Sequence, residues 1–214
     1  MAKQETYAAG SGEITSHRGA SNGGSTRYGD ARSGESTCSG ESTRSGDVDC
    51  GKVRNDGTSC SVREARYNDV PAILHLLERV NLVHHLGRPD IFKKATKYTD
   101  EELKAIMDDP GQLLLVAEDG EGKVCGHAFC MFQQHLGNQL LTDIKTLYVD
   151  DICVDDGHRR QNIGTALYEA VRKAATEHDC HNITLNVWEL NPGAMAFYRS
   201  LGLTPLKTML EERL

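Results

Sequence analysis

A change of hydrophobic period between neighbouring segments is the feature that most constrains the fold of this chain. Residues 144–154 form a largely apolar run typical of a buried strand. After a short turn, six apolar residues recur at helical spacing: Ile163, Ala166, Leu167, Ala170, Val171 and Ala174. Such a stripe covers one face of a helix and needs another surface to bury it. The strand and the helix together predict an α/β domain.

Other helix and strand signals flank this unit. A cap at Asn68 or Asp69 predicts a helix that ends near Asn81, and Thr99 opens a second short helix in a capping-box pattern. Strands are predicted at residues 61–66, 113–118, 123–132, 144–154, 182–187 and 203–209, and a short helix at 192–200. Strands and helices in this order predict a mixed sheet with helices packed against it.

The first 60 residues differ in composition from the rest of the chain. They hold 11 of the 21 glycines, and beyond Met1 their only aliphatic residues larger than Ala are Ile14, Val48 and Val53. Such a stretch buries too little apolar surface to offset an ordering entropy of roughly 1–2 kcal/mol per residue. We therefore predict a disordered Gly/Ser/Thr-rich tail at residues 1–60 and a single domain at residues 61–214.

The charge balance disfavours several classes of function. The formal net charge is −7, and residues 61–214 carry 17 basic against 23 acidic side chains. Nucleic-acid backbones are bound by clustered Lys and Arg, so no nucleic-acid partner is predicted. No stretch approaches the roughly 18 consecutive apolar residues of a membrane span, and the N-terminus lacks the apolar core of a signal peptide. We expect a soluble, cytoplasmic protein with no membrane partner.

The seven cysteines show neither a CxxC pair nor zinc-type spacing. Without a signal peptide, a disulfide framework is not expected either. We therefore predict no metal, and we interpret the cysteines of the domain as small buried hydrophobic residues.

A turn with two arginines and a glycine connects the strand to the long helix. The first N–H groups of a helix lack intrahelical partners and carry part of the helix dipole, so this turn suits a pyrophosphate. Arg159 and Arg160 would add charge-assisted donors, and Gly164 would let the ligand approach the backbone. The segment is neither a Walker loop nor a dinucleotide fingerprint. The alternative is a plain capped helix with solvated arginines.

Two segments together resemble a known family. The turn is similar to the R-x-x-G-x-G/A motif of the GNAT superfamily of acetyl-CoA-dependent N-acyltransferases, with Arg159, Asn162 and Gly164 at its three defined positions. Residues 191–203 resemble the family's closing N-x-x-A-x-x-F-Y-x-x-x-G-F element. Asn162 departs from the usual glycine, but asparagine tolerates left-handed backbone better than most residues. The resemblance covers residues 61–214.

The resemblance implies a fold and a set of cofactor contacts. The fold is a mixed, mostly antiparallel sheet flanked by helices, with splayed central strands that bind acetyl-CoA. The pantetheine arm would pair with the strand before the motif, and the pyrophosphate would lie on the turn. The implied acetyl-CoA residues are Ile152, Cys153, Val154, Arg159, Arg160, Gln161, Asn162, Ile163, Gly164, Thr165, Asn191 and Ala194.

The resemblance also implies catalytic groups. Tyr198 matches the tyrosine thought to protonate the departing thiolate, and a phenol of pKa roughly 10 suits a thiol of pKa roughly 8.5. In polyamine-type members an acidic pair precedes the cofactor strand, where this chain has Asp150 and Asp151, and the resemblance places Asp150 at the substrate-contacting position. Strand alternation predicts that the two point to opposite faces, so that one faces the pocket; which one is left open. The alternative for each is a solvated or ion-paired carboxylate.

The acceptor side carries less signal. Tyr148 would line the site, and His84, His85 and Arg88 lie in the region where these enzymes usually build specificity. We expect transfer of an acetyl group from acetyl-CoA to a primary amine, a small cationic amine or a polyamine, by direct attack in a ternary complex. A protein N-terminus or lysine is the second acceptor, and a non-catalytic acyl-CoA-binding module is the alternative from another class. A homodimer is compatible with the sequence.

Overall fold

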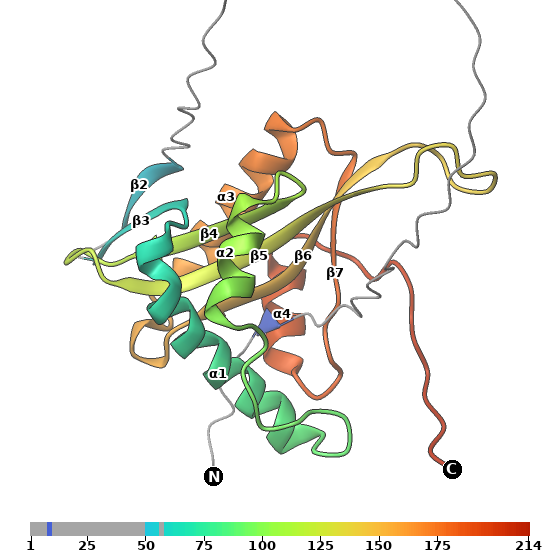
Figure 1. Cartoon of the computed structure of the whole chain (residues 1–214), viewed down its shortest axis with the longest axis horizontal. Coiled ribbons are helices and arrows are strands. Elements are labelled where there is room, and N and C mark those ends of the chain that lie inside the picture. The colour runs from blue at the N-terminus through green and yellow to red at the C-terminus, as the bar shows by residue number, and fades with distance from the viewer. Residues whose placement is uncertain (1–7, 10–49, 56–57) are drawn as a thin grey trace, which may run out of the picture. The chain divides into compact units, whose positions relative to one another are not determined.

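The computed structural model describes residues 8–9, 50–55 and 58–214 (Figure 1). Most of the predicted disordered tail therefore lies outside the described residues. Regular structure nevertheless precedes the boundary predicted at residue 61, because strand β2 (Cys50–Asn55) pairs antiparallel with β3 (Thr58–Glu64). The prediction of disorder rests on the few side chains that the tail can bury. The pairing of β2 with β3 depends instead on backbone hydrogen bonds, which any residue except proline can donate.

Seven strands of the described residues form one sheet. Besides β2 and β3 they are β1 (Ala8–Ala9), β4 (Gln112–Glu118), β5 (Val124–Gln134), β6 (Lys145–Val154) and β7 (Asn182–Leu185). Their order is β1-β6-β5-β4-β3-β2, and β7 also pairs with β6. Every pair is antiparallel except β6–β7, which is parallel. The predicted mixed, mostly antiparallel sheet is confirmed.

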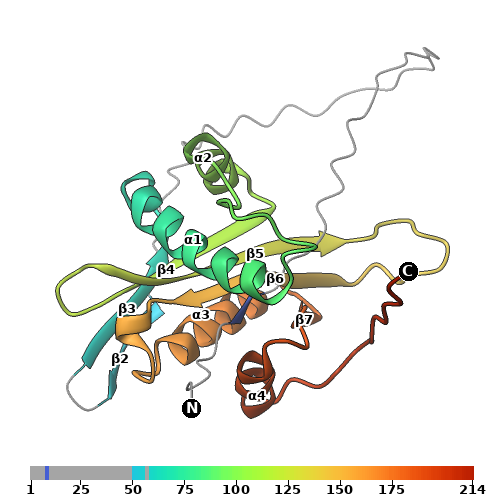
Figure 2. The same ribbon diagram turned by 90° about the horizontal axis from the view of Figure 1, so that it is seen from below.

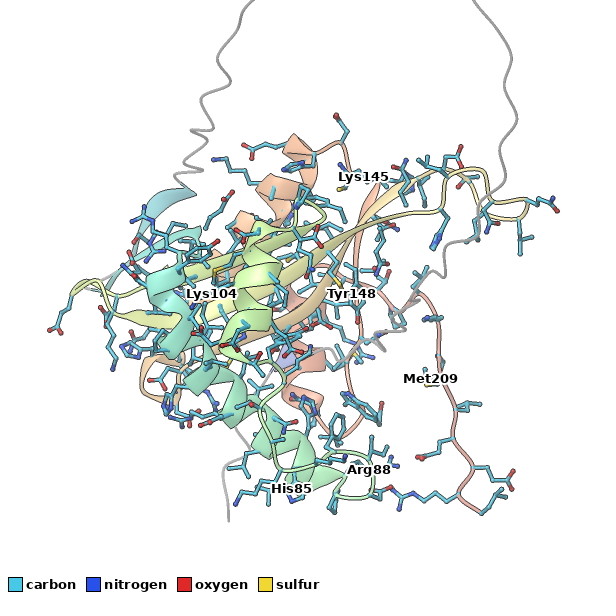
Figure 3. The ribbon with its side chains drawn as sticks, viewed as in Figure 1. His85, Arg88, Lys104, Lys145, Tyr148 and Met209 are labelled. Carbon is cyan, nitrogen blue, oxygen red and sulfur yellow. The ribbon has the colours of Figure 1, made fainter. Side chains whose placement is uncertain are left out.

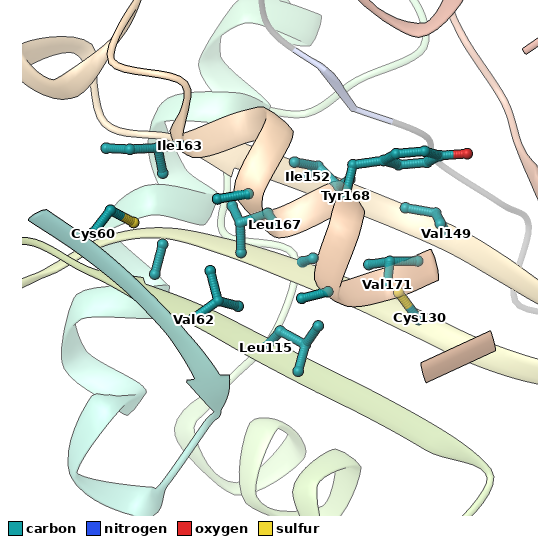
Figure 4. Close-up of a cluster of buried hydrophobic side chains, with 14 of the residues drawn as sticks. Cys60, Val62, Leu115, Cys130, Val149, Ile152, Ile163, Leu167, Tyr168 and Val171 are labelled. Atoms are coloured by element: carbon teal, nitrogen blue, oxygen red, sulfur yellow. The ribbon is translucent and has the colours of Figure 1, made fainter. Parts of the chain in front are cut away.

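Four helices cover the two faces of this sheet (Figure 2). They are α1 (Val70–Gly87), α2 (Asp100–Asp108), α3 (Ile163–Glu177) and α4 (Pro192–Ser200), with single 3-10 turns at Tyr67–Asp69 and Asp156–His158. Alternation along β4 divides the core. Leu114 and Val116 join the cluster under α1 and α2, whereas Leu115 and Ala117 join the larger cluster under α3 (Figure 4).

Local sequence signals fix where these helices begin. The Thr99 side chain accepts a hydrogen bond from the Glu102 N–H, and the Glu102 carboxylate accepts one from the Thr99 N–H, so the predicted capping box is confirmed. The helix predicted to end near Asn81 instead continues to Gly87. Its extra turns bury His84, which is 5% exposed and occupies a core position that apolar periodicity does not count.

The strand predicted at residues 203–209 is absent from the structure. Leu206 and Met209 are 78% and 87% exposed, and Met209 lies on a terminal segment away from the sheet (Figure 3). The apolar residues there predicted a strand. Strand β7 offers only four residues for a further strand to pair with, and Pro205 has no N–H to donate to a sheet hydrogen bond. The prediction of a final strand was therefore wrong.

Candidate active site

Strand β6 separates from its parallel neighbour partway along its length. Pairing with β7 ends at Val149, while β6 continues to Val154. Beyond the separation, Asp151 and Ile152 pair antiparallel with the two residues of β1. The edge at which the pantetheine arm is predicted thus accepts an extended backbone, and a pantetheine bound there would replace β1.

A β-bulge at Asp150 changes the direction of the acidic pair. Phe129 of β5 pairs with Asp151 and the next residue, Cys130, pairs with Val149, so Asp150 is the extra residue of β6. A bulge places two residues opposite one and interrupts the alternation of side chains. Because the alternation is broken here, the predicted split of the two carboxylates between opposite faces of the sheet no longer follows.

The surroundings of the two carboxylates show that they share one region. Asp150 Oδ2 contacts Lys97 and lies 3.4 Å from the Tyr98 hydroxyl. Asp151 Oδ2 lies 3.4 Å from His127 Nε2. The rings of His127 and Tyr98 both pack against Phe129, at centroid distances of 5.2 and 5.6 Å. Asp150 and Asp151 therefore belong to one cluster, and the prediction of opposite faces was wrong.

Lys97 supplies a cation to this buried acidic pair. Asp150 and Asp151 are 2% and 3% exposed. Burial alone would lower the pKa of Lys97, but the attraction of Asp150 and then of Asp151 outweighs it, and the pKa of Lys97 is raised. The lysine therefore remains protonated near neutral pH. Asp151 Oδ1 is buried and has no hydrogen-bond partner among the described residues.

Tyr198 projects from α4 into the core and is 4% exposed. Burial raises the pKa of its phenol far above the ordinary value, and the charge of Asp151 raises it further. The phenol therefore keeps its proton at neutral pH. Tyr198 packs in the same buried cluster as Val149 and Ile152, the β6 residues on either side of the acidic pair.

The turn before α3 has the backbone geometry that its sequence predicts. Asn162 has a φ of 62° in the left-handed region, so the tolerance expected of asparagine is confirmed, and Arg160 has the same φ. Arg159 is turned toward the fold, because its guanidinium pairs with Asp156 and its side chain is 12% exposed. Of the two predicted phosphate donors, Arg160 is exposed and Arg159 is held by the turn.

Several predicted cofactor residues offer only their backbone. The side chains of Ile152, Cys153 and Ile163 are buried in the core. A Cβ at Gly164 would lie 3.4 Å from the ring of Phe197, so this glycine also lies at the contact between α3 and α4. The side chains of four others, Val154, Gln161, Thr165 and Asn191, range from nearly buried to half-buried.

Asn191 has a structural role in addition to the predicted one. Its Oδ1 accepts a hydrogen bond of 3.0 Å from the N–H of the fully buried Ala194, which caps α4. This cap fixes the start of the helix that carries Tyr198. The amide oxygen of Asn191 is thus engaged within the protein.

The predicted specificity region divides into two parts. His84 lies in the interior, whereas His85 and Arg88 lie near the end of α1 (Figure 3). His85 Nδ1 is 2.7 Å from the Phe92 carbonyl oxygen, and Arg88 pairs with two surface carboxylates. The Tyr148 hydroxyl, at the same β6 edge as the acids, accepts a hydrogen bond from Asn186.

Sequence reasoning missed two polar residues of the cluster. Lys97 lies in a connection without periodicity, and His127 lies in an otherwise apolar strand. The signal for His127 is a polar residue inside an apolar run, whose burial at 0% exposure requires a partner. The contact of Lys97 with Asp150 depends on the path of the connection, which the sequence does not reveal.

Neither a metal-binding cluster nor a membrane-spanning helix occurs in the described part of the chain. It contains no group of three or more His, Cys, Asp or Glu side chains that would hold a metal ion. None of its helices has both the length and the apolar character needed to cross a bilayer. Cys60, Cys125, Cys130 and Cys153 are free and buried, and Cys180 is free and partly exposed.

Known proteins resemble this chain in sequence and in fold. Mouse N-alpha-acetyltransferase 30 is 27% identical over 151 residues, which make up 68% of this chain but only 40% of that protein. Bovine thialysine N-epsilon-acetyltransferase is 26% identical over 145 residues, or 66% of this chain and 82% of that protein. The crystal structure of a mutant BH1408 protein from Bacillus halodurans matches with a TM-score of 0.69 and 28% identity, covering 72% of this chain and 98% of that one.

The family assignment rests on the segment that holds the site. Residues 80–203 match the acetyltransferase (GNAT) family. This range contains the bulged strand, the left-handed turn before α3 and the helix that carries Tyr198. The chain belongs to the GNAT acetyltransferase family.

Proposed function

We propose that this chain transfers an acetyl group from acetyl-CoA to a primary amine by direct attack within a ternary complex. One observation carries the proposal: Tyr198 packs in the same buried cluster as Val149 and Ile152, which flank the acidic pair beside the point where β6 leaves β7. An acid–base pair at this place serves both ends of the reaction. The amine must lose a proton, and the thiolate must gain one.

The chain's own residues divide this work. Asp151, with a buried oxygen that has no partner in the described part of the chain, attracts the ammonium group and accepts its proton. As the nitrogen–carbon bond forms and the carbon–sulfur bond breaks, Tyr198 gives its proton to the sulfur. A backbone N–H of the β6 edge polarises the carbonyl oxygen, and the protein holds both substrates in contact.

Acetyl-CoA fits the remaining features of the site. The β6 edge at residues 152–154 would pair with the pantetheine arm in place of β1, and the turn at residues 160–165 would hold the pyrophosphate. In support, the left-handed residue Asn162 directly precedes the first turn of α3, whose N–H groups lack intrahelical partners. Arg160 is exposed at the same turn and adds a cation.

For the acceptor we propose a small cationic amine or a polyamine. Residues 61–214 are acidic, and a negative field raises the local concentration of cations. The names of the bovine and mouse relatives specify an ε-amine and an α-amine, both of them primary. The mouse name favours a protein N-terminus as the second candidate. We further propose a cytoplasmic location and a capacity to form homodimers.

The test is thiol release from acetyl-CoA with a panel of amines and peptides. We expect release above background for at least one primary amine, and acetylated product by mass spectrometry. CoA binding without release for any amine or peptide would contradict the proposal and favour a non-catalytic binding module. Asp151→Asn should reduce release while leaving CoA binding intact.

A further inference from the structure

Three aromatic rings from separate segments meet near the end of α1. His84 of α1 stacks on Phe92 with ring centroids 4.9 Å apart, and Phe92 meets Trp188 edge-on at 5.1 Å. The rings of His84 and Trp188 are 6.4 Å apart. We call His84, Phe92 and Trp188 the aromatic cluster. It joins α1, the α1–α2 connection and the loop after β7 into one apolar surface.

Packing places this cluster next to the site. Leu76, on the same helix as His84, packs against Cys153 of β6, two residues from Asp151. Burial lowers the pKa of His84, the charge of Asp151 opposes the shift, and Lys97 lowers the pKa further, so the imidazole is neutral near pH 7. Its Nδ1 is buried and, like Asp151 Oδ1, has no hydrogen-bond partner among the described residues. Buried polar atoms usually have partners, so two such atoms near one surface indicate a place for a ligand.

The charges of the site leave room for one further cation. Among the described residues, the Lys97 ammonium contacts Asp150 and the His127 ring contacts Asp151, and both carboxylates are buried. When the imidazole is neutral, the two carboxylates and the lysine carry a net charge of −1. One ammonium group from an acceptor balances it.

Building on the function proposed above, we propose that Lys97 determines acceptor specificity. Of the two acceptor classes proposed above, it favours the small amine with a single positive charge, whose apolar chain lies on the aromatic cluster, over the polyamine, because it neutralises Asp150. A second ammonium group along the chain would come close to Lys97 with no carboxylate left to balance it. Without the lysine, the second carboxylate would accept that charge.

The magnitude follows from the repulsion between two like charges. At an effective dielectric of about 20, two cations roughly 12 Å apart repel enough to weaken binding about tenfold. Cation–π attraction between the second ammonium group and the aromatic faces would offset part of this repulsion. We therefore expect about a tenfold preference of the unaltered protein for a monoamine over a diamine of equal length.

The experiment compares n-hexylamine with cadaverine, which differ only by a terminal methyl group in place of an ammonium group. We expect kcat/KM to favour hexylamine by about tenfold in the unaltered chain, and Lys97→Met to bring the ratio near one. Lys97→Arg keeps the charge and should keep the preference. The matched control is Lys104→Met, which removes a lysine of α2 that pairs with Asp100 at the surface (Figure 3) and should leave the ratio unchanged.

The outcomes separate this inference from the function on which it rests. Absence of thiol release with every amine would remove the proposed function itself. Turnover with an unchanged ratio in Lys97→Met, or an initial preference for cadaverine, would overturn the role of Lys97 alone. Acetylation of peptides but not of hexylamine would do the same. If circular dichroism shows that Lys97→Met does not fold, Lys97→Gln replaces it. Loss of the preference for hexylamine in Lys97→Gln would support the role of Lys97, and retention of this preference would overturn it.

Discussion

Replacing Tyr198 with phenylalanine removes one hydroxyl group and leaves the aromatic ring in place. The ring packs against Phe197 and Tyr168, at centroid distances of 5.2 and 6.3 Å, and both contacts survive the substitution. The proposed proton donor is therefore removed with little change in packing. Acetyl-CoA affinity should be nearly unaffected, because the predicted cofactor contacts lie on β6, on the turn before α3 and at the start of α4.

The expected loss is in turnover. Burial and Asp151 keep the phenol protonated, so the unaltered chain delivers a proton to the leaving sulfur across the neutral range. General acids contribute about 10²–10⁴-fold to rate. A thiolate departs without help more readily than stronger bases do, which places the effect at the lower end. We expect kcat to fall about 100-fold, or about 2.7 kcal/mol in activation free energy.

Steady-state thiol release gives kcat, and calorimetric titration gives the acetyl-CoA affinity. Tyr168→Phe is the matched control, since Tyr168 is equally buried at 4% exposure and neighbours Tyr198. It should retain kcat. Unchanged turnover in Tyr198→Phe, or equal losses in the two variants, would refute Tyr198 as the acid. A fall in acetyl-CoA affinity that matches the fall in rate would instead assign Tyr198 to binding.

Three further predictions concern stability and cofactor access. Gly126→Ala places a Cβ 2.8 Å from the Cys153 carbonyl oxygen and should lower the free energy of unfolding by about 1–3 kcal/mol in urea titrations. Burial raises the pKa of Asp69, but hydrogen bonds from Arg63 at 2.7 and 3.0 Å outweigh burial and lower this pKa. The stability that these hydrogen bonds contribute is therefore present above the ordinary Asp pKa of about 3.9. It is lost as the pH falls through the lower pKa of the folded state. Thermal unfolding of Asp69→Asn against pH should show no such loss. Removal of residues 1–12 takes β1 off the edge of β6, where the pantetheine arm is proposed to bind. Acetyl-CoA then no longer displaces β1, so its KM should fall several-fold in initial-rate assays. An unchanged KM would contradict pantetheine binding at that edge.

Elements with strong local signals were predictable from the sequence. The helix at residues 192–200 has the predicted bounds, and α3 begins at Ile163 as its apolar stripe indicates. The predictions that were wrong concern segments whose structure depends on contacts with other parts of the chain. Residues 203–209 have the composition of a strand but no strand beside them, and α1 continues past Asn81 because His84 is buried by residues distant in sequence.

The candidate site divides in the same way. The left-handed backbone of Asn162 follows from the residue type and its place in the motif, so the sequence sufficed. The direction of Asp151 does not follow from its own strand, because the bulge is defined by the register between β6 and β5. Lys97 and Trp188 lie in irregular connections, whose paths depend on the packing of the whole domain.

The motif residues of this chain act largely by shaping the backbone. Arg159 holds the turn through Asp156, Asn162 adopts the left-handed conformation, and Asn191 caps the helix that carries Tyr198. Substitutions at these positions should therefore change stability and acetyl-CoA binding together. Lys97, by contrast, acts through charge from a connection outside the regular elements, so its replacement should alter the choice of acceptor with little effect on the cofactor. Specificity in this domain can then diverge through the α1–α2 connection while the cofactor half stays constant.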